Sequence, residues 1–477
     1  MKTIKPLAAL LLAIAVPWPA AAKENSFAPV EKSVKQRTNH EVRWAQDMTA
    51  REQSLAQARA LLKRPLTVSS AVQIALLNNP ALQAGFEEIG LSYADVREAR
   101  MLANPEVDLA IKFPDRPPTA PLYEWGIAQN FLNLLMIPLR SRVARDQLAA
   151  AQLRVADEVV ALVSEVKVAF YELQAGEALL AKLRTMQEGQ AVSLQLMQKL
   201  HEAGNVPDLS LSREQSAYSE ARLEIAKAEA EGREHREKLN RLLGVWGRDT
   251  HWKLAGELPR VPDAEPTVRG LETLAVANRY DLAAARTGLE STVRALGLEK
   301  TFRFIGALDF GIAGETEPDK TNLLGPSVRL ELPIFNQGQA RIARGEAQLR
   351  MAHRKFERLA IDIRSQVREL RDRLISKRDI ARFYRDDLLP ARQRITADTL
   401  LQYNAMLVGA FEAFQARRES VEAERGMIEA TRDYWITRAE LERAVGGDLD
   451  AAARTRALAT SESKTVKTVK TTKTRKP

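Results

Sequence analysis

The sequence has no cysteine among its 477 residues. This excludes disulfide bonds, thiolate metal sites, cysteine nucleophiles and lipid attachment through an N-terminal cysteine. The glycines form no phosphate-binding loop, and most carboxylates lie beside Arg or Lys, where solvated helical pairs explain them. The histidines stand apart without the spacing of metal ligands, at His40, His201, His235, His251 and His353. We therefore expect no enzyme activity, no cofactor and no metal site.

The body of the chain lacks net charge, although the whole chain carries +9. Residues 1–22 contribute +2 and residues 451–477 contribute +7, so residues 23–450 are neutral. Because nucleic-acid binding needs basic residues gathered on the working surface, we exclude nucleic acid as a partner. The tail, 448–477, is rich in Thr, Lys and Ser and is predicted to be disordered. It is either a solvated tether or a contact for anionic lipid or peptidoglycan.

Long apolar runs are also missing, and the one at the N-terminus is too short to cross a bilayer. Lys2 and Lys5 precede the apolar residues 7–16, and small residues follow up to Ala22. This pattern is typical of a secretory signal peptide, so we predict 1–22 as the signal peptide. An uncleaved anchor helix is the alternative. The mature protein is then periplasmic, secreted or inserted in a membrane through β-strands.

The body of the chain repeats itself at a spacing of about 200 residues. Three sets of positions match in the same order, and they are Asn78 with Asn278, 138 with 333, and 241–244 with 443–446. Ordered matches of this kind predict two copies of one structural unit. The resulting divisions are an N-terminal periplasmic segment (23–65), a first repeat (66–244), a linker or equatorial segment (245–270) and a second repeat (271–447).

Each copy is predicted to contain two β-strands, because apolar and polar residues alternate with a period of two. In the first copy the apolar positions are Val107, Leu109, Ile111, Phe113, Tyr123, Trp125, Ile127 and Phe131. In the second copy they are Phe302, Phe304, Leu308, Phe310, Ile312, Val328, Leu330, Leu332 and Ile334. Polar turn residues separate the strands of each pair.

A long helical hairpin is predicted after each pair of strands. Residues 139–201 contain no proline, and a helix of about 60 residues extends about 90 Å. Pro138 and Pro333 are each expected to end a strand and open the long helix. In the second copy Pro390 is expected to interrupt the outgoing helix. Narrow apolar stripes flanked by Arg and Glu are typical of coiled coils.

Four strands cannot close a membrane barrel, because single-chain barrels begin at eight strands. An open sheet in lipid would leave its edges unpaired. Either several chains share one barrel, or the strands form a soluble layer that packs on helices. The signal peptide and the aromatic apolar faces favour the membrane.

The sequence resembles the outer-membrane efflux protein family typified by TolC over about residues 66–447. The motifs that carry the resemblance are Asn-Asn-Pro-Ala-Leu (78–82), Asn-Arg-Tyr-Asp-Leu (278–282), Leu-Glu-Leu-Pro-Ile-Phe-Asn-Gln-Gly-Gln (330–339) and Arg-Ala-Glu-Leu-Glu-Arg-Ala-Val-Gly-Gly (438–447). The resemblance implies a mainly α-helical homotrimer, in which a 12-stranded outer-membrane β-barrel continues into a long coiled-coil α-barrel. It also implies a periplasmic adaptor protein and an inner-membrane pump as partners.

The resemblance assigns adaptor docking to the hairpin turns, tip 1 (201–209) and tip 2 (403–412). The docking residues are Gly204, Val206, Pro207, Asp208, Leu209, Tyr403, Met406, Leu407 and Gly409. Met406 departs from the family, in which glycine is common at this point of the turn. Rings of carboxylates select cations, and the candidate gate residues are Asp208, Glu214 and Glu412. Charged strand residues are expected to face a water-filled lumen, and they are Asp108, Lys112, Asp309 and Glu331.

We interpret the protein as the outer-membrane exit channel of a tripartite efflux system that exports metal ions or small toxic compounds. The segment 403–447 resembles members associated with heavy-metal resistance, although no His or Met cluster supports a metal cargo. The outer-membrane component of a type I secretion system is one alternative. A periplasmic adaptor is another, although it needs one hairpin flanked by lipoyl-like modules. The signal peptide and strands disfavour a cytoplasmic coiled-coil scaffold.

Overall fold

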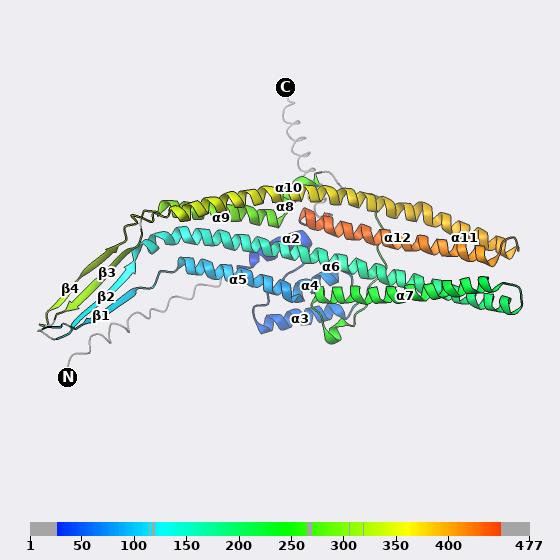
Figure 1. The fold of residues 1–477 in the computed structure, drawn as a ribbon, viewed down its shortest axis with the longest axis horizontal. Coiled ribbons are helices and arrows are strands. Elements are labelled where there is room, and N and C mark those ends of the chain that lie inside the picture. The colour runs from blue at the N-terminus through cyan, green and yellow to red at the C-terminus, as the bar shows by residue number, and fades with distance from the viewer. Residues whose placement is uncertain are drawn as a thin grey trace, which may run out of the picture.

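The computed structural model describes residues 26–113, 115–116, 120–264, 270–304, 306–317 and 319–449. The molecule is elongated, with a β-sheet at one end and two long helical hairpins that run to the other end (Figure 1). The predicted signal peptide and most of the predicted tail lie outside the described residues. Within the described ranges, no helix combines the length and the apolar content that a bilayer crossing needs.

Two helices, two strands and a helical hairpin follow one another in the first half of the body. The side chain of Asn79 accepts a hydrogen bond from the N–H of Leu82 and caps the second helix. Pro80 occupies the first helical position, where no N–H is needed. The elements are α4 (Val68–Asn78), α5 (Pro80–Arg100), β1 (Glu106–Lys112), β2 (Leu122–Asn130), α6 (Phe131–Glu202) and α7 (Asp208–Leu243).

The same kinds of element follow in the second half, where one helix is interrupted. A π-helical turn, η2 (Tyr384–Leu388), separates α10 from α11. It lies just before Pro390, which has no N–H to donate to the carbonyl four residues earlier. The elements are α8 (Leu271–Asn278), α9 (Tyr280–Thr301), β3 (Leu308–Thr316), β4 (Asn322–Leu330), α10 (Gln339–Phe383), α11 (Leu389–Asn404) and α12 (Ala410–Val445).

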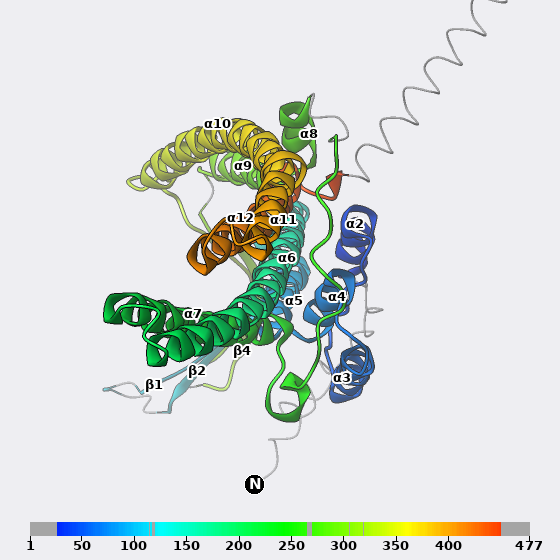
Figure 2. The same ribbon diagram turned by 90° about the vertical axis from the view of Figure 1, so that its right-hand side faces the viewer.

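Three short elements form a side layer against the long helices: α2 (Ala28–Thr38), α3 (Met48–Leu62) and the 3₁₀ turn η1 (Gly247–Thr250). Figure 2 shows α2, α3 and α4 on one side of the long helices. From α2, the guanidinium of Arg37 lies 4.0 Å over the ring of Tyr280, and the Ser33 hydroxyl is hydrogen-bonded to the Tyr280 hydroxyl. Through these contacts of α2, the side layer is connected to the second half of the chain.

The long helices bury their apolar stripes in two core clusters. The first cluster joins α4, α5, α6 and α7 and contains Phe86, Phe170 and Leu239. The second joins α8, α10 and α12 and contains Ile363, Leu374 and Tyr434. Burying each large apolar side chain contributes about 1.5–3 kcal/mol. The apolar residues predicted to share one face of the first long helix are all buried, namely Val159, Leu162, Val163, Val166 and Phe170.

The four strands form one antiparallel sheet in the order β1-β2-β3-β4. The β2–β3 pairing, in which Ile127 faces Ile312, joins the two halves of the chain. Directly paired residues lie on the same face of a sheet, and the register gives one apolar face and one polar face. The apolar face carries Val107, Leu109, Ile111, Tyr123, Trp125, Ile127, Leu308, Phe310, Ile312, Leu324, Val328 and Leu330.

Several predicted boundaries are wrong. Asn130 caps α6 by accepting a hydrogen bond from Asn133, so the helix begins at Phe131 and contains Pro138. Pro333 instead precedes α10, so the two prolines are not equivalent. The strands are shorter than predicted, because residues 302–304 follow the end of α9 and residues 331–338 follow the end of β4. The interruption of the outgoing helix predicted at Pro390 is confirmed, because the π-turn η2 ends at Leu388 and α11 begins with Pro390 in its first turn.

Candidate functional site

Tip 1 closes with a turn centred on Gly204, which has a left-handed φ of 74°. The N–H of Gly204 donates to the carbonyl of His201 at 2.8 Å. The N–H of Asn205 donates to the carbonyl of Leu200, also at 2.8 Å. This pair of bonds is a Schellman motif, in which glycine is favoured because it has no Cβ. Pro207 then precedes α7 with an extended backbone.

Tip 2 has the same backbone construction, but with a side chain at its centre. Met406 has a φ of 59°, and its N–H donates to the carbonyl of Tyr403 at 2.9 Å. The N–H of Leu407 donates to the carbonyl of Gln402 at 2.9 Å. Gly409 precedes α12 with an extended backbone. Met406 therefore stands where glycine is common in the family, and the turn has the same backbone hydrogen bonds as that of tip 1.

The surface of tip 1 is largely polar. The two ring nitrogens of His201 face two acceptors, the Val206 carbonyl at 3.1 Å from Nδ1 and the Asp208 carboxylate at 3.2 Å from Nε2. Leu209 is the large apolar side chain that tip 1 exposes. These contacts connect the end of α6 to the loop and to the start of α7.

The surface of tip 2 is apolar instead. Met406 is 92% exposed and Leu407 is 75% exposed. Further exposed apolar side chains from the same end of the hairpin are Leu400, Leu401 and Phe411. Exposed apolar side chains gathered in one place mark interaction surfaces in soluble regions of proteins.

The three candidate gate carboxylates are divided between the two tips. Asp208 contacts His201, and Glu214 accepts a hydrogen bond from the hydroxyl of Ser193 on α6. Glu412 is exposed at tip 2. The structure therefore does not gather the three carboxylates into one cluster within a single chain.

The polar face of the sheet carries three of the four predicted lumen residues, Asp108, Lys112 and Asp309. Lys112 forms an ion pair with Glu124 on the neighbouring strand. Glu331 lies just beyond β4, and its N–H donates to the carbonyl of Ala307 at 2.9 Å. Glu331 therefore continues the strand pairing by one bond without belonging to the strand.

The family motifs at the starts and ends of the two halves lie against each other. The side-chain amide of Asn78 donates to the carbonyl of Gly244 at 2.7 Å. A Cβ on Gly244 would lie 2.6 Å from the Asn78 carbonyl, and one on Gly446 would lie 3.1 Å from the Asn278 carbonyl. Both glycines also have a left-handed φ. These close contacts explain why glycine stands at both positions.

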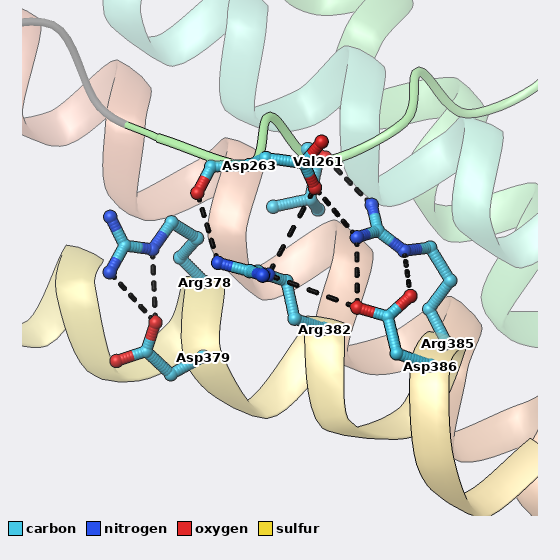
Figure 3. Close-up of polar contacts among 7 residues, drawn as sticks. All are labelled: Val261, Asp263, Arg378, Asp379, Arg382, Arg385 and Asp386. Carbon is cyan, nitrogen blue, oxygen red and sulfur yellow. Dashed lines mark hydrogen bonds and ion pairs between the residues drawn. The ribbon is translucent and has the colours of Figure 1, made fainter.

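An arginine cluster at the π-turn is a feature that we did not predict from the sequence. Arg385 donates to the Asp263 carboxylate at 2.7 Å and to the Val261 carbonyl at 3.2 Å (Figure 3). Arg382 donates to the Asp263 carbonyl at 3.0 Å. The Asp386 and Asp263 carboxylates hold the pKa of the Arg385 guanidinium above its usual range. The sequence gives no signal for this contact, because 122 residues separate Asp263 from Arg385.

Among the residues that the structure describes, no group of three or more His, Cys, Asp or Glu side chains could hold a metal ion. The candidate site consists of the two exposed tips and the polar face of the sheet.

Residues 135–245 match the family model described as outer membrane efflux protein. No curated protein matches the chain in sequence. The family match falls on α6 and α7. It confirms the resemblance to the outer-membrane efflux protein family that we predicted from the motifs.

Solved structures of outer-membrane channels have the same fold. CusC is 18% identical, with a TM-score of 0.66 and coverage of 80% of this chain and 92% of that chain. The outer-membrane channel OprN is 16% identical, with a TM-score of 0.67 and coverage of 91% and 98%. The Campylobacter jejuni CmeC outer membrane channel is 13% identical, with a TM-score of 0.69 and coverage of 81% and 88%. These likenesses establish a TolC-like, mainly helical fold.

Proposed function

We propose that the protein is the outer-membrane exit channel of a tripartite efflux system and that it works as a homotrimer. The observation that carries the proposal is a four-stranded sheet with one apolar and one polar face, from which the chain leads into two long hairpins. Within the described residues, each outer strand, β1 and β4, has one edge without a strand partner. Such edges favour pairing with another chain.

Three copies can close this sheet into a barrel, if β1 of one copy pairs with β4 of the next. Three sheets of four strands give twelve, an even number in the range of outer-membrane barrels. The apolar face would contact lipid, which explains why Leu109 is 72% exposed and Leu324 is 71% exposed. The polar face would line the water-filled lumen and continue into the tunnel formed by the hairpins.

We further propose that the two halves of the chain are copies of one unit, 66–244 and 271–447. The corresponding positions of the two tips and of Gly244 and Gly446 support this, because each pair is separated by 202 residues. Residues 23–65 are proposed as an N-terminal periplasmic segment, and residues 245–270 as a linker or equatorial segment. The signal peptide and the basic tail remain predictions.

The hairpin tips are proposed to dock on a periplasmic adaptor protein that connects the channel to an inner-membrane pump. Exposed apolar side chains at tip 2 and the polar turn of tip 1 support this assignment. No catalytic residues are involved, because a conduit acts through its shape and its charge.

We propose metal cations as cargo ahead of small toxic compounds. The polar face of the sheet carries five acidic and two basic side chains. This excess of negative charge would attract cations into a lumen. These residues are Glu106, Asp108, Glu124, Asp309 and Glu315, with Lys112 and Arg329.

Substitution of Gly409 by Glu tests the docking assignment. Gly409 has a φ of −80°, which any residue adopts, and a Cβ there would meet only the flexible end of the Glu412 side chain. We expect Gly409→Glu to leave trimers in the outer membrane and to reduce tolerance of exported compounds to that of a deletion strain. Gly189→Glu, on the exposed surface of α6, is the control and should keep full tolerance. Unchanged tolerance in the Gly409→Glu strain would remove the assignment.

A further inference from the structure

A cavity of about 720 Å³, here called the central cavity, lies between the long helices. Its walls come from α6, α7, α10 and α12, together with Arg279 between α8 and α9. Val168 lines the cavity and lies halfway along α6, so the cavity is far from both the sheet and the tips. Its volume is that of a site for a small organic molecule.

The central cavity opens on the face of the long helices that is turned away from the side layer. On α6, Val163 and Val166 pack in the first core cluster, which includes residues of α2 and α4. Glu165 and Val168 line the cavity, and each lies two positions after one of these valines, a rotation of about 200° around a helix. Figure 2 shows α10, α12, α6 and α7 in a curved row, with α2, α3 and α4 on its outer side. In the proposed trimer the cavity would therefore face the tunnel.

The walls of the central cavity carry more basic than acidic side chains. The basic side chains are Lys238, Arg241, Arg279, Arg373 and Arg443, and the acidic ones are Glu165, Glu369 and Glu440. On the polar face of the sheet, by contrast, acidic side chains outnumber basic ones. Because a cleft lined by an excess of one charge concentrates ions of the opposite charge, anions are attracted to the central cavity.

Three of the five basic side chains of the cavity have close acidic partners. The pairs are Arg279 with Asp281 at 2.6 Å, Lys238 with Glu172 at 2.6 Å, and Arg373 with Glu440. These ion pairs explain the presence of the three basic side chains without any ligand.

The other two basic side chains, Arg241 and Arg443, have donors available for a ligand. Within the described part of the chain, the Arg241 guanidinium has no hydrogen bond or ion pair. Arg443 has one ion pair, with Glu165 at 3.9 Å, in which both side chains are half-exposed. Such an exposed pair contributes little, and it leaves most of the five N–H donors of the guanidinium unused.

Arg241 and Arg443 occupy corresponding positions of the two halves of the chain. Each lies three residues before a glycine with a left-handed φ that ends its helix, Gly244 or Gly446. The Gly244 N–H donates to the Arg241 carbonyl at 3.2 Å, and the Gly446 N–H donates to the Arg443 carbonyl at 3.0 Å. A basic residue is favourable at the end of any helix, but this effect alone does not bring two of them to one cavity. The backbone of each arginine is therefore fixed, while its side chain is exposed.

We propose that the central cavity binds small molecules with carboxylate or phosphate groups, and that the guanidinium groups of Arg241 and Arg443 bind those groups. A guanidinium presents its N–H donors in a planar fork that matches both kinds of oxyanion. Glu165 competes with the ligand for Arg443 and so limits the affinity. This inference rests on the proposed function only for the position of the cavity in the tunnel wall, because all residues of the cavity belong to one chain. Anionic small molecules would then bind in the channel, in addition to the cations that the sheet attracts.

Isothermal titration calorimetry of the full-length protein, purified in detergent at low salt, tests the site. Citrate is the carboxylate probe and pyrophosphate is the phosphate probe. The double variant Arg241→Gln, Arg443→Gln removes both guanidinium groups and keeps polar side chains. The control double variant Arg51→Gln, Arg64→Gln removes the same charge from exposed positions on α3 and just after it. Glu165→Gln removes the competing carboxylate.

We expect the wild type to bind at least one probe, and the Arg241→Gln, Arg443→Gln variant to bind it about tenfold more weakly, as for loss of charge-assisted hydrogen bonds. The control variant should match the wild type. Glu165→Gln should bind more tightly, a change that partial unfolding cannot produce. Binding of neither probe, or equal affinities in the wild type and the Arg241→Gln, Arg443→Gln variant, would overturn the site. A protein that binds the probe as expected but forms no trimers would instead contradict the proposed function and support the site.

Discussion

Met406 adopts at tip 2 the left-handed backbone conformation that Gly204 adopts at tip 1, with φ values of 59° and 74°. Both residues close the same Schellman turn. Only Gly204 does so without steric cost, because the Cβ of Met406 is close to backbone atoms in this conformation. Tip 2 therefore combines a strained residue with an exposed apolar surface, and such strain persists where the surrounding structure or a function maintains it.

Met406→Gly should relieve this strain and stabilise tip 2 by about 1 kcal/mol. Hydrogen exchange of the amides of Met406 and Leu407, which close the turn, should become slower. Met406→Ala is the control, because it removes the same apolar side chain and keeps the Cβ. Faster exchange in Met406→Gly than in Met406→Ala would contradict the strain.

Gly244→Ala should destabilise the junction between α7 and α4 by about 1–3 kcal/mol. Its Cβ would lie 2.6 Å from the Asn78 carbonyl, in addition to the cost of a φ of 67°. Gly247→Ala is the control. Gly247 has a φ of 61°, and no atom lies within 4 Å of a Cβ added there, so this variant measures the backbone cost alone. Apparent melting temperatures at one scan rate should fall further for Gly244→Ala, and equal values would show that the close contact is relieved.

The acidic excess on the polar face of the sheet predicts a channel that prefers cations. Glu124→Gln and Glu315→Gln together should move the reversal potential in a salt gradient toward zero. Glu52→Gln on the exposed surface of α3 removes a charge elsewhere and should leave the potential unchanged. Anion preference in the wild type would contradict a lumen lined by this face.

Mild acid should destabilise the side layer through His40. Burial, and then the charge of Lys167, lower the pKa of His40 below its usual value of 6.5, against smaller opposite effects of Gln73 and Asp448. The unfolded chain then binds a proton at a higher pH than the folded chain, so stability is lost as the pH falls below about 6.5. The apparent melting temperature should fall more between pH 7.5 and pH 5 in the wild type than in His40→Gln, and parallel curves would exclude His40 as the cause.

The sequence predicted the strands and hairpins well, because period-two alternation and long proline-free stretches are local signals. The predicted start of β3 is too early. Phe302 and Phe304 fit the period-two alternation, but they lie between the end of α9 and the start of β3. The start of α6 was predicted too late, at residue 139, because that prediction relied on Pro138. The side chain of Asn130 caps the helix, so α6 begins at Phe131. Contacts across a long separation, such as Asp263 with Arg385, leave no periodic pattern in the sequence.

Native mass spectrometry of the mature protein, released from outer-membrane detergent extracts, determines whether three copies share one barrel. We expect a single dominant species of three chains, which separates into monomers when Ile312, on the apolar face in the middle of β3, is replaced by Asp. A wild-type protein that is monomeric or dimeric in the outer-membrane extract would contradict it, because the proposed barrel of twelve strands needs three chains of four strands each.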